Sequence, residues 1–576
     1  MKKALAILLT VSLLLLLFAG CGNSSATTSE ESTAPAAVSE ETATEEVVAA
    51  EESASAPASA AEADTDPAEP AISTAEIGAE PEFVEASWPL DEEVIFTMFF
   101  QYNARDSEES GYSGPQDYPC FEWIHELTNV FIDFDTQSMD AYQEHFNLQM
   151  ASQDYDDLYL NCFSLYTSGG DGAYEDEVWI DLKDLIYTYC PNYCAVMDEY
   201  DGMKKAAMTD SGLMMSFMKV QESCVKNGFA TRGDWLDELG LDVPTTLDEW
   251  YETALAMDNA YDVLYPFATL PPSCAFYADT TFLVAEDGTV SYKYYDNDDF
   301  YAWLETGIKW YEAGLLNVDI ILGSFEGMGI DTNKVDGWSA VGDTAIWGSE
   351  QRFIVYDDTY GYDAVYEAIP LPTGNGNDIA YASGIDEPYN AMMNISTACK
   401  EPELACQWVD WFYSEEGTIL CNFGMEGTNY CYNEDGEMRY TDEYVEATQT
   451  GMQMHQPFAG TTPGNYCYVY RAAPEEMQAQ TSKPKALEAK ALWNTDVDMT
   501  TGRYPTFATV ATEDSDAYGK IYSDIETYVE EYESKVLAGE YDLAATWDEY
   551  NENLRNMGVE EMIGYKQVAY DAYLIR

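Results

Sequence analysis

Regular hydrophobic patterning begins near Asp91, where short apolar runs start to alternate with amphipathic segments. Residues 94–100 form a nearly continuous apolar run, which is typical of a strand buried on both faces. The elements predicted after it are a helix at 122–128, a strand at 130–134, a helix at 141–152 and a strand at 158–160. This alternation of strands and helices predicts an α/β fold with a parallel, doubly wound sheet.

A second group of elements follows in the middle of the chain. Thr246 and Glu249 stand at capping-box spacing in front of an amphipathic helix. Asp287-Gly288 separates two strand-like runs, which is a strong hairpin signal. A helix at 298–314 is predicted to end at Gly314. Further strands are expected at 340–347 and 365–369, so this group predicts a second α/β lobe.

Helical periodicity dominates after residue 395. One helix is predicted to begin at Pro402, and a long one to cover 517–537. Two final helices, from Thr546 and from Val559, are expected to meet at Gly558.

The N-terminus carries the pattern of an export signal. Lys2 and Lys3 precede an apolar run that ends at Ala19, and this run is shorter than the roughly 20 residues of a membrane-spanning helix. Phe18-Ala19-Gly20-Cys21 resembles the bacterial lipobox, in which the cysteine is lipidated, although Phe18 replaces the usual leucine. Residues 1–21 are therefore predicted to be a lipoprotein signal peptide with lipidation at Cys21, and an ordinary signal peptide is the alternative.

Residues 22–88 have a different composition, rich in Ser, Thr, Ala, Pro and Glu and without Lys or Arg. Such a segment cannot bury enough apolar surface to offset its ordering entropy, and its like charges repel one another. We expect a disordered acidic tether.

Composition limits what the chain can do. Its 576 residues are too many for one hydrophobic core and predict at least two domains. The formal net charge of -81 repels nucleic acid and anionic membrane surfaces, so no nucleic-acid partner is expected. The aromatic content of 14% supplies core residues and also faces that can stack on small ligands.

Cysteine and histidine patterns predict no metal and no cofactor. Twelve cysteines occur, and those other than Cys21 form an odd number without framework spacing. Most are expected to be small buried apolar residues, with a Cys190–Cys194 disulfide as an alternative. The three histidines belong to no HExxH motif, and no CxxC pair, EF-hand loop, Walker loop or GxSxG motif is present.

Four groups of segments resemble one known family in the order that the family has them. They are Arg232–Leu241 with Pro244–Trp250, Trp310–Leu316, Ser414–Gly417 with Gly424–Gly427, and Trp547–Gly558 with Tyr570–Tyr573. On these segments the chain resembles the lipoprotein solute-binding components of ABC importers, in family 1, which mainly handles oligosaccharides. The resemblance implies a non-enzymatic protein, anchored at the extracellular face of the membrane through its N-terminal lipid only, whose partners are an oligosaccharide and the permease subunits of an ABC transporter.

The resemblance also implies a periplasmic-binding-protein-like fold, in which two discontinuous lobes joined by a hinge trap the ligand. The expected N-terminal lobe comprises residues 91–223 plus about 395–490, and the C-terminal lobe comprises 224–394 plus about 491–576 with the closing helices. We expect a monomer.

Candidate ligand contacts follow the predicted strand ends, because ligands of open α/β sheets lie beyond the carboxyl ends of strands. Aromatic faces would contact sugar rings, and fixed polar groups would bind hydroxyls. The candidates of the first lobe are Tyr102, Asn103, Arg105, Asp106 and Tyr166, the last with the turn at 167–170. Those of the second lobe are Phe276, Trp338, Trp347 and Glu350, with Trp493. For each, a solvated loop or core packing is the alternative interpretation.

Three functions remain open at this stage. The first is capture of an oligosaccharide by lobe closure and its delivery to a membrane importer. The second is binding of a peptide, an amino-acid derivative or a polyamine, for which Asp106 or Glu350 would serve as anchors on an acidic protein. The third is a cell-surface glycosidase, since 106 carboxylates make an acid pair easy to form but also uninformative.

Overall fold

The computed structural model describes residues 83–102, 111–138, 141–316, 341–345, 365–449, 457–462, 472, 480 and 484–576. Within these ranges, residues 167, 201, 222, 226, 262–265, 268–269, 383–384 and 387 are not described. By internal contacts the chain divides into Met1–Ile77 and Gly78–Arg576, and all described residues belong to the second unit.

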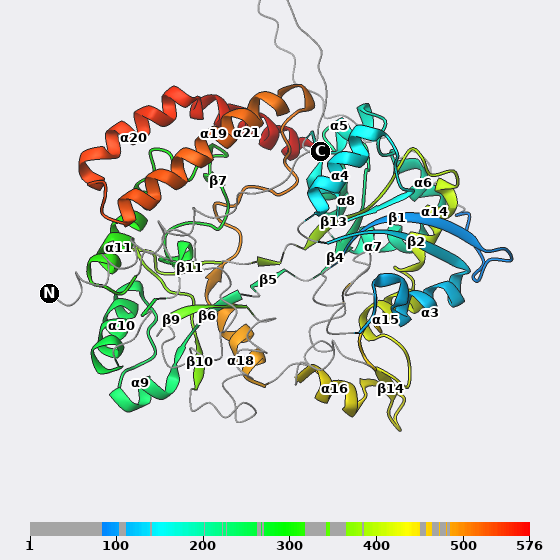
Figure 1. Cartoon of the computed structure of the whole chain (residues 1–576), viewed down its shortest axis with the longest axis horizontal. Helices are drawn as coiled ribbons and strands as arrows, with labels where there is room; N and C mark the ends of the chain where they lie inside the picture. Colours follow the sequence, from blue (N-terminus) through cyan, green and yellow to red (C-terminus); the bar gives the residue numbers. More distant parts are fainter. Residues whose placement is uncertain are drawn as a thin grey trace, which may run out of the picture. The chain divides into compact units, whose positions relative to one another are not determined.

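A five-stranded sheet forms the first half of the fold (Figure 1). Its strands, in spatial order, are β2 (Val130–Ser138), β1 (Val94–Tyr102), β3 (Leu158–Leu160), β13 (Tyr389–Ile395) and β4 (Phe217–Val220). β1 pairs in parallel with β2 and β3, as predicted, but β13 pairs antiparallel with both β3 and β4. The parallel arrangement predicted for β1, β2 and β3 is confirmed. β13 comes from a distant part of the chain and makes the complete sheet a mixed one.

Helices cover this sheet and complete its core. They include α3 (Pro119–Thr128), α4 (Tyr142–Ser152), α6 (Lys183–Tyr189), α7 (Pro191–Glu199), α14 (Pro402–Trp411) and α15 (Glu415–Phe423). Met98 of β1, Leu158 of β3 and Trp408 of α14 are fully buried in one apolar cluster. Residues remote in sequence thus share one core.

A three-stranded antiparallel sheet forms the centre of the second half, with β6 (Asn227–Arg232) between β10 (Tyr366–Ile369) and β9 (Val341–Ala345). The elements around it are α9 (Gly233–Leu239), α10 (Leu247–Tyr261), β7 (Phe282–Val284), β8 (Val290–Tyr292), α11 (Asp298–Glu312) and α18 (Pro484–Trp493). Phe267 stacks on Trp310 of α11 with ring centroids 3.8 Å apart, and both residues are fully buried.

Local signals in this half are confirmed. The Glu249 N–H donates to Thr246 Oγ1 over 3.2 Å, and the Thr246 N–H donates to Glu249 Oε2 over 3.1 Å, which is the reciprocal capping box. β7 and β8 pair antiparallel around Asp287-Gly288. Gly314, with φ at 79°, follows the end of α11 in the left-handed conformation that favours glycine.

Two of the segments that connect the sheets pair with each other. β5 (Cys224–Val225) follows β4, and it pairs antiparallel with β12 (Ile385–Asp386), which precedes β13. β13 then lies in the first sheet, beside β3 and β4. α18 packs against β6 and β10 of the second sheet.

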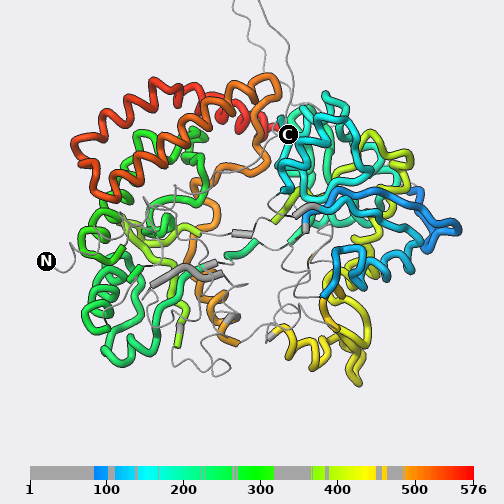
Figure 2. The backbone as a smooth tube through the Cα atoms, in the orientation of Figure 1, coloured from blue at the N-terminus to red at the C-terminus, as the bar shows by residue number. Residues whose placement is uncertain are grey.

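Three C-terminal helices, α19 (Thr512–Leu537), α20 (Leu543–Met557) and α21 (Val559–Ile575), pack against one another (Figure 2). Gly558 separates the last two with φ at 99°, as predicted. α19 packs on α11, while Arg576 Nε donates to Asp210 Oδ1 over 2.7 Å near the first sheet. Among the residues that the structure describes, no helix is long and apolar enough to span a bilayer.

The described cysteines are free thiols, and this includes Cys190 and Cys194. Cys190 Sγ donates to the Cys406 carbonyl oxygen over 3.5 Å, and Cys194 Sγ donates to that of Ile186 over 3.6 Å. The alternative of a disulfide between the two is therefore contradicted. Most of these thiols are buried, as the prediction of small apolar residues requires.

Asp410 of α14 binds the N-terminus of α7. Its carboxylate is 4% exposed and accepts from the Tyr193 N–H and from Asn192 Nδ2, each over 2.7 Å. Burial raises the pKa of this carboxyl to about 6, although the hydrogen bonds oppose that rise. The carboxylate therefore takes the place of a capping side chain that α7 lacks.

We expect Asp410→Ala to lower the free energy of unfolding by about 2–3 kcal/mol, because it leaves buried N–H donors without an acceptor. Asp410→Asn keeps one acceptor oxygen and should lose less. Urea unfolding at pH 7.5 measures both, and a loss below roughly 0.5 kcal/mol for the alanine variant would contradict this role.

Candidate functional site

The carboxyl ends of β1 and β3 lie on neighbouring strands of the first sheet, as the predicted site requires. Tyr102 is the last residue of β1. Asn103, Arg105 and Asp106 lie outside the described residues. The structure thus places the strand end, and the polar loop that follows it stays a sequence-based prediction.

Tyr166 follows β3 and is partly exposed beside a buried aromatic cluster. Its ring centroid lies 5.6 Å from that of Trp179, and its hydroxyl donates to Asp176 Oδ2 over 2.5 Å. Burial and the contact with Asp176 raise the pKa of the Tyr166 hydroxyl. An oriented phenol at a strand end presents a flat face and a fixed hydrogen-bonding group.

The turn after Tyr166 leads into α5 (Gly169–Glu175), which the start of α19 contacts. Ser515 Oγ donates to Ser168 Oγ over 3.4 Å. A Cβ on Gly172 would lie 2.3 Å from Ser168 Cβ, so glycine permits the turn to pack against α5, while the Thr512 side chain lies at ordinary contact distance. The predicted turn is therefore partly covered by the C-terminal helices.

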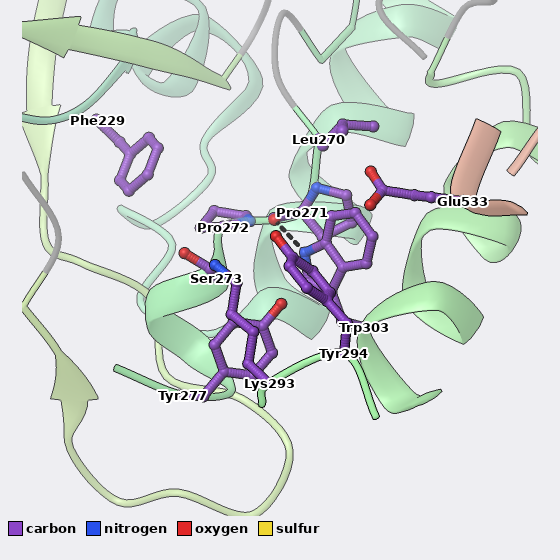
Figure 3. A pocket seen from close by; sticks show the side chains of 10 residues that line it. All are labelled: Phe229, Leu270, Pro271, Pro272, Ser273, Tyr277, Lys293, Tyr294, Trp303 and Glu533. Carbon is purple, nitrogen blue, oxygen red and sulfur yellow. Dashed lines mark hydrogen bonds between the residues drawn. The ribbon is translucent and has the colours of Figure 1, made fainter. Parts of the chain in front are cut away.

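A cavity of about 270 Å³ lies in the second half of the fold (Figure 3). The strand β6, the loop after α10, the segment that follows β8, α11 and α19 each contribute to its wall. The lining residues are Phe229, Leu270, Pro271, Pro272, Ser273, Tyr277, Lys293, Tyr294, Trp303 and Glu533. Trp303 Nε1 donates to the Pro271 carbonyl oxygen over 2.7 Å, which ties α11 to the loop.

Two groups of opposite charge line this cavity. The Lys293 ammonium lies 4.8 Å from the Tyr294 ring centroid and 5.7 Å from that of Tyr277, within cation–π range. Burial lowers the pKa of Lys293, against the opposing effects of Asp279 and Glu533. Burial raises the pKa of Glu533 to about 7, and Lys293 only partly opposes this rise. The site therefore holds a desolvated acid and a desolvated base.

The Glu533 carboxyl should make stability depend on pH. Its pKa is about 7 in the folded chain and near 4.5 when unfolded, so the folded state holds the proton more tightly. Stability is then lost as pH rises from about 4.5 to 7, by up to roughly 3 kcal/mol. We expect Glu533→Gln to remove this component, measured as the difference between parent and variant in urea unfolding at pH 5 and pH 8.

Glu531→Gln is the matched control, because Glu531 is an exposed residue of the same helix. An unchanged pH difference in Glu533→Gln would show that this carboxyl titrates as in the unfolded chain.

Two of the predicted contact residues are packing residues. Trp493 is fully buried in the core of the second half, and its Nε1 donates to the Ile369 carbonyl oxygen over 3.0 Å. A Cβ on Gly228 would lie 2.2 Å from the Trp493 ring, so the indole covers β6 directly. Phe276 is 2% exposed in the same core. These side chains present no face to a ligand in this structure.

Trp338, Trp347 and Glu350 lie outside the described residues and stay predictions from the sequence. Lys293 and Glu533, in contrast, did not appear among the candidates. The sequence did contain a signal that Glu533 is buried. It follows Tyr532, next to the apolar face of α19 that carries Val529 and Val536. No comparable signal marked Lys293, which directly follows β8, because a lysine in such a position is usually solvated.

No cluster of three or more His, Cys, Asp or Glu side chains that could hold a metal ion occurs in the part of the chain that the structure describes.

Comparison with known proteins identifies the class. Residues 128–419, just over half of the chain, match the model of the bacterial extracellular solute-binding protein family. The chain belongs to this family, whose members bind solutes and are not enzymes. Its fold is therefore the α/β periplasmic-binding-protein-like fold that was expected.

Individual relatives align over most of the chain. The fructooligosaccharide ABC transporter substrate-binding protein FusA of Streptococcus pneumoniae is 22% identical over 511 residues, which are 80% of this chain and 88% of FusA. The crystal structure of the alginate-binding protein AlgQ2 is similar with a TM-score of 0.68 and 19% identity, over 85% of this chain and all of that one. The structure of an HMO-binding, ABC-transporter-associated solute-binding protein from Bifidobacterium longum infantis is also similar, with a TM-score of 0.67 and 16% identity over 84% of this chain and 99% of that one.

Proposed function

We propose that this chain is the substrate-binding component of an ABC importer and that its substrate is an oligosaccharide. The observation that carries the proposal is the membership in the solute-binding family, together with a relative described as a fructooligosaccharide-binding protein that aligns over 80% of the chain. Structures described as binding alginate and HMO, both carbohydrates, share the fold. Several relatives that share this fold are thus described as binding carbohydrates.

Capture would occur by hinge closure of two discontinuous lobes, with the paired β5 and β12 strands next to the hinge. On the first lobe, Tyr102, Asn103, Arg105, Asp106 and Tyr166 are the proposed contacts. On the second, Trp338, Trp347 and Glu350 are proposed. Aromatic faces at both sides would close on sugar rings, and the fraction of closed protein would depend on how much better the closed state binds the sugar.

Cys21 and the acidic segment at 22–88 are proposed to hold the protein at the outer face of the membrane. The lipid would supply attachment and the tether would set the reach toward the permease. The solute-binding domain would act as a monomer.

Isothermal calorimetry and thermal shift against a panel of fructooligosaccharides, uronate oligomers and milk-type glycans test the substrate class. We expect at least one oligosaccharide to bind and to raise the melting temperature. The panel includes polyamines and short basic peptides, because the net charge of -81 favours a cationic solute as the second candidate. Binding of those ligands with no response to any glycan would replace the oligosaccharide proposal by the second one.

A further inference from the structure

The two charged groups line the same cavity but do not pair with each other. Within the described chain, neither the Lys293 ammonium nor the Glu533 carboxyl makes an ion pair or a side-chain hydrogen bond. Figure 3 shows the Glu533 carboxyl pointing from α19 toward Leu270 and Pro271. Both charges are therefore available to a molecule that enters.

Unpaired charges in a desolvated site are costly and are normally matched by a partner. The rest of the cavity wall supplies no further charge, since its other side chains are apolar, aromatic or hydroxyl-bearing and the Trp303 N–H is already bound to Pro271. A cavity of about 270 Å³ is large enough for several water molecules or for one small organic molecule.

We propose that this cavity is a binding site for a small zwitterion of α-amino acid size. The ligand carboxylate binds the Lys293 ammonium, and the ligand ammonium binds the Glu533 carboxylate. The Tyr277, Tyr294 and Trp303 rings contact the apolar part of the ligand.

Opposite charges in one cavity select for a ligand that carries both signs. A simple anion would be attracted by Lys293 but repelled by Glu533. A simple cation would be attracted by Glu533 but repelled by Lys293. A neutral sugar can form hydrogen bonds with both groups but compensates neither charge. The cavity thus differs in its chemistry from a carbohydrate cleft, and this inference does not rest on the proposed oligosaccharide function.

Calorimetry and thermal shift with the full chain at pH 8 test the site, with each common L-α-amino acid as a separate probe. We expect at least one amino acid to bind. Its N-acetyl derivative lacks the positive charge and its methyl ester lacks the negative charge, and each should bind about tenfold or more weakly.

Lys293→Met and Glu533→Gln should each weaken amino-acid binding about tenfold or more. Each substitution removes a desolvated charge, so we expect both variants to stay folded at pH 8, with the melting temperature as the check. Lys309→Met is the control, since Lys309 lies on α11 but is exposed and donates to Asp248. Its affinity for the amino acid should be unchanged.

Glycan binding separates this site from the proposed transport substrate. All three variants should bind an oligosaccharide like the parent, with or without amino acid present. The inference is overturned if no amino acid binds, if the Lys293 and Glu533 variants retain the parent affinity, or if amino acid and oligosaccharide compete for the same site.

Discussion

Replacing Gly417 with alanine is expected to destabilise the first half of the fold by about 3 kcal/mol or more. Gly417 lies in the first turn of α15, where its N–H donates to the capping Ser414 Oγ over 3.1 Å. A Cβ at this position would lie 2.2 Å from the Trp411 carbonyl oxygen and 2.6 Å from Phe412 Cα. Both are backbone atoms at the end of the preceding helix. The steric clash can therefore be removed only if α15 moves away from the buried core beneath it.

Urea unfolding of Gly417→Ala measures this effect, and Gly519→Ala is its matched control. Gly519 lies inside α19, and a Cβ there would have no heavy atom within 4 Å. Alanine at that position should stabilise the chain by about 0.5–1 kcal/mol, because it lowers the entropy cost of a helix interior. Equal stability of the two variants would mean that the close contact at Gly417 relaxes without cost.

Loss of the proposed lipid attachment should have the largest effect on transport. We expect Cys21→Ser to reduce ligand uptake by whole cells about tenfold or more, because a released protein loses the high effective concentration that a tether gives near its permease. The same variant, purified, should bind its ligand with the parent affinity, because Cys21 lies in the segment before the described domain.

Uptake of labelled ligand by intact cells and calorimetry of the soluble protein check the two parts of this prediction. A Phe18→Leu variant, which restores the usual lipobox residue, is the matched control and should retain full uptake. Undiminished uptake by the Cys21→Ser cells would contradict a role for anchoring, whereas a lost affinity of the purified variant would show that the substitution harms folding.

Features that depend on neighbouring residues were predictable from the sequence. The Thr246–Glu249 capping box, the hairpin at Asp287-Gly288 and the break at Gly558 all appear as expected. Each is decided by backbone conformation or hydrogen bonding within a few residues, so the local pattern contains the necessary information.

Partners that are distant in the chain were not predictable in this way. Trp493 was expected to face a ligand, but it packs on β6 because Gly228 leaves room for an indole there. A single sequence does not show which of several tryptophan side chains packs against a strand glycine such as Gly228.

By itself, the sequence determined the α/β class, the order of the main helices and strands, the acidic segment at 22–88 and the resemblance to solute-binding proteins. Only the tertiary structure decided the antiparallel entry of β13 and the meeting of Lys293 with Glu533 in one cavity. The physical reason is that helix and turn signals are local, whereas sheet order and the environment of a charge depend on contacts between segments far apart in the chain.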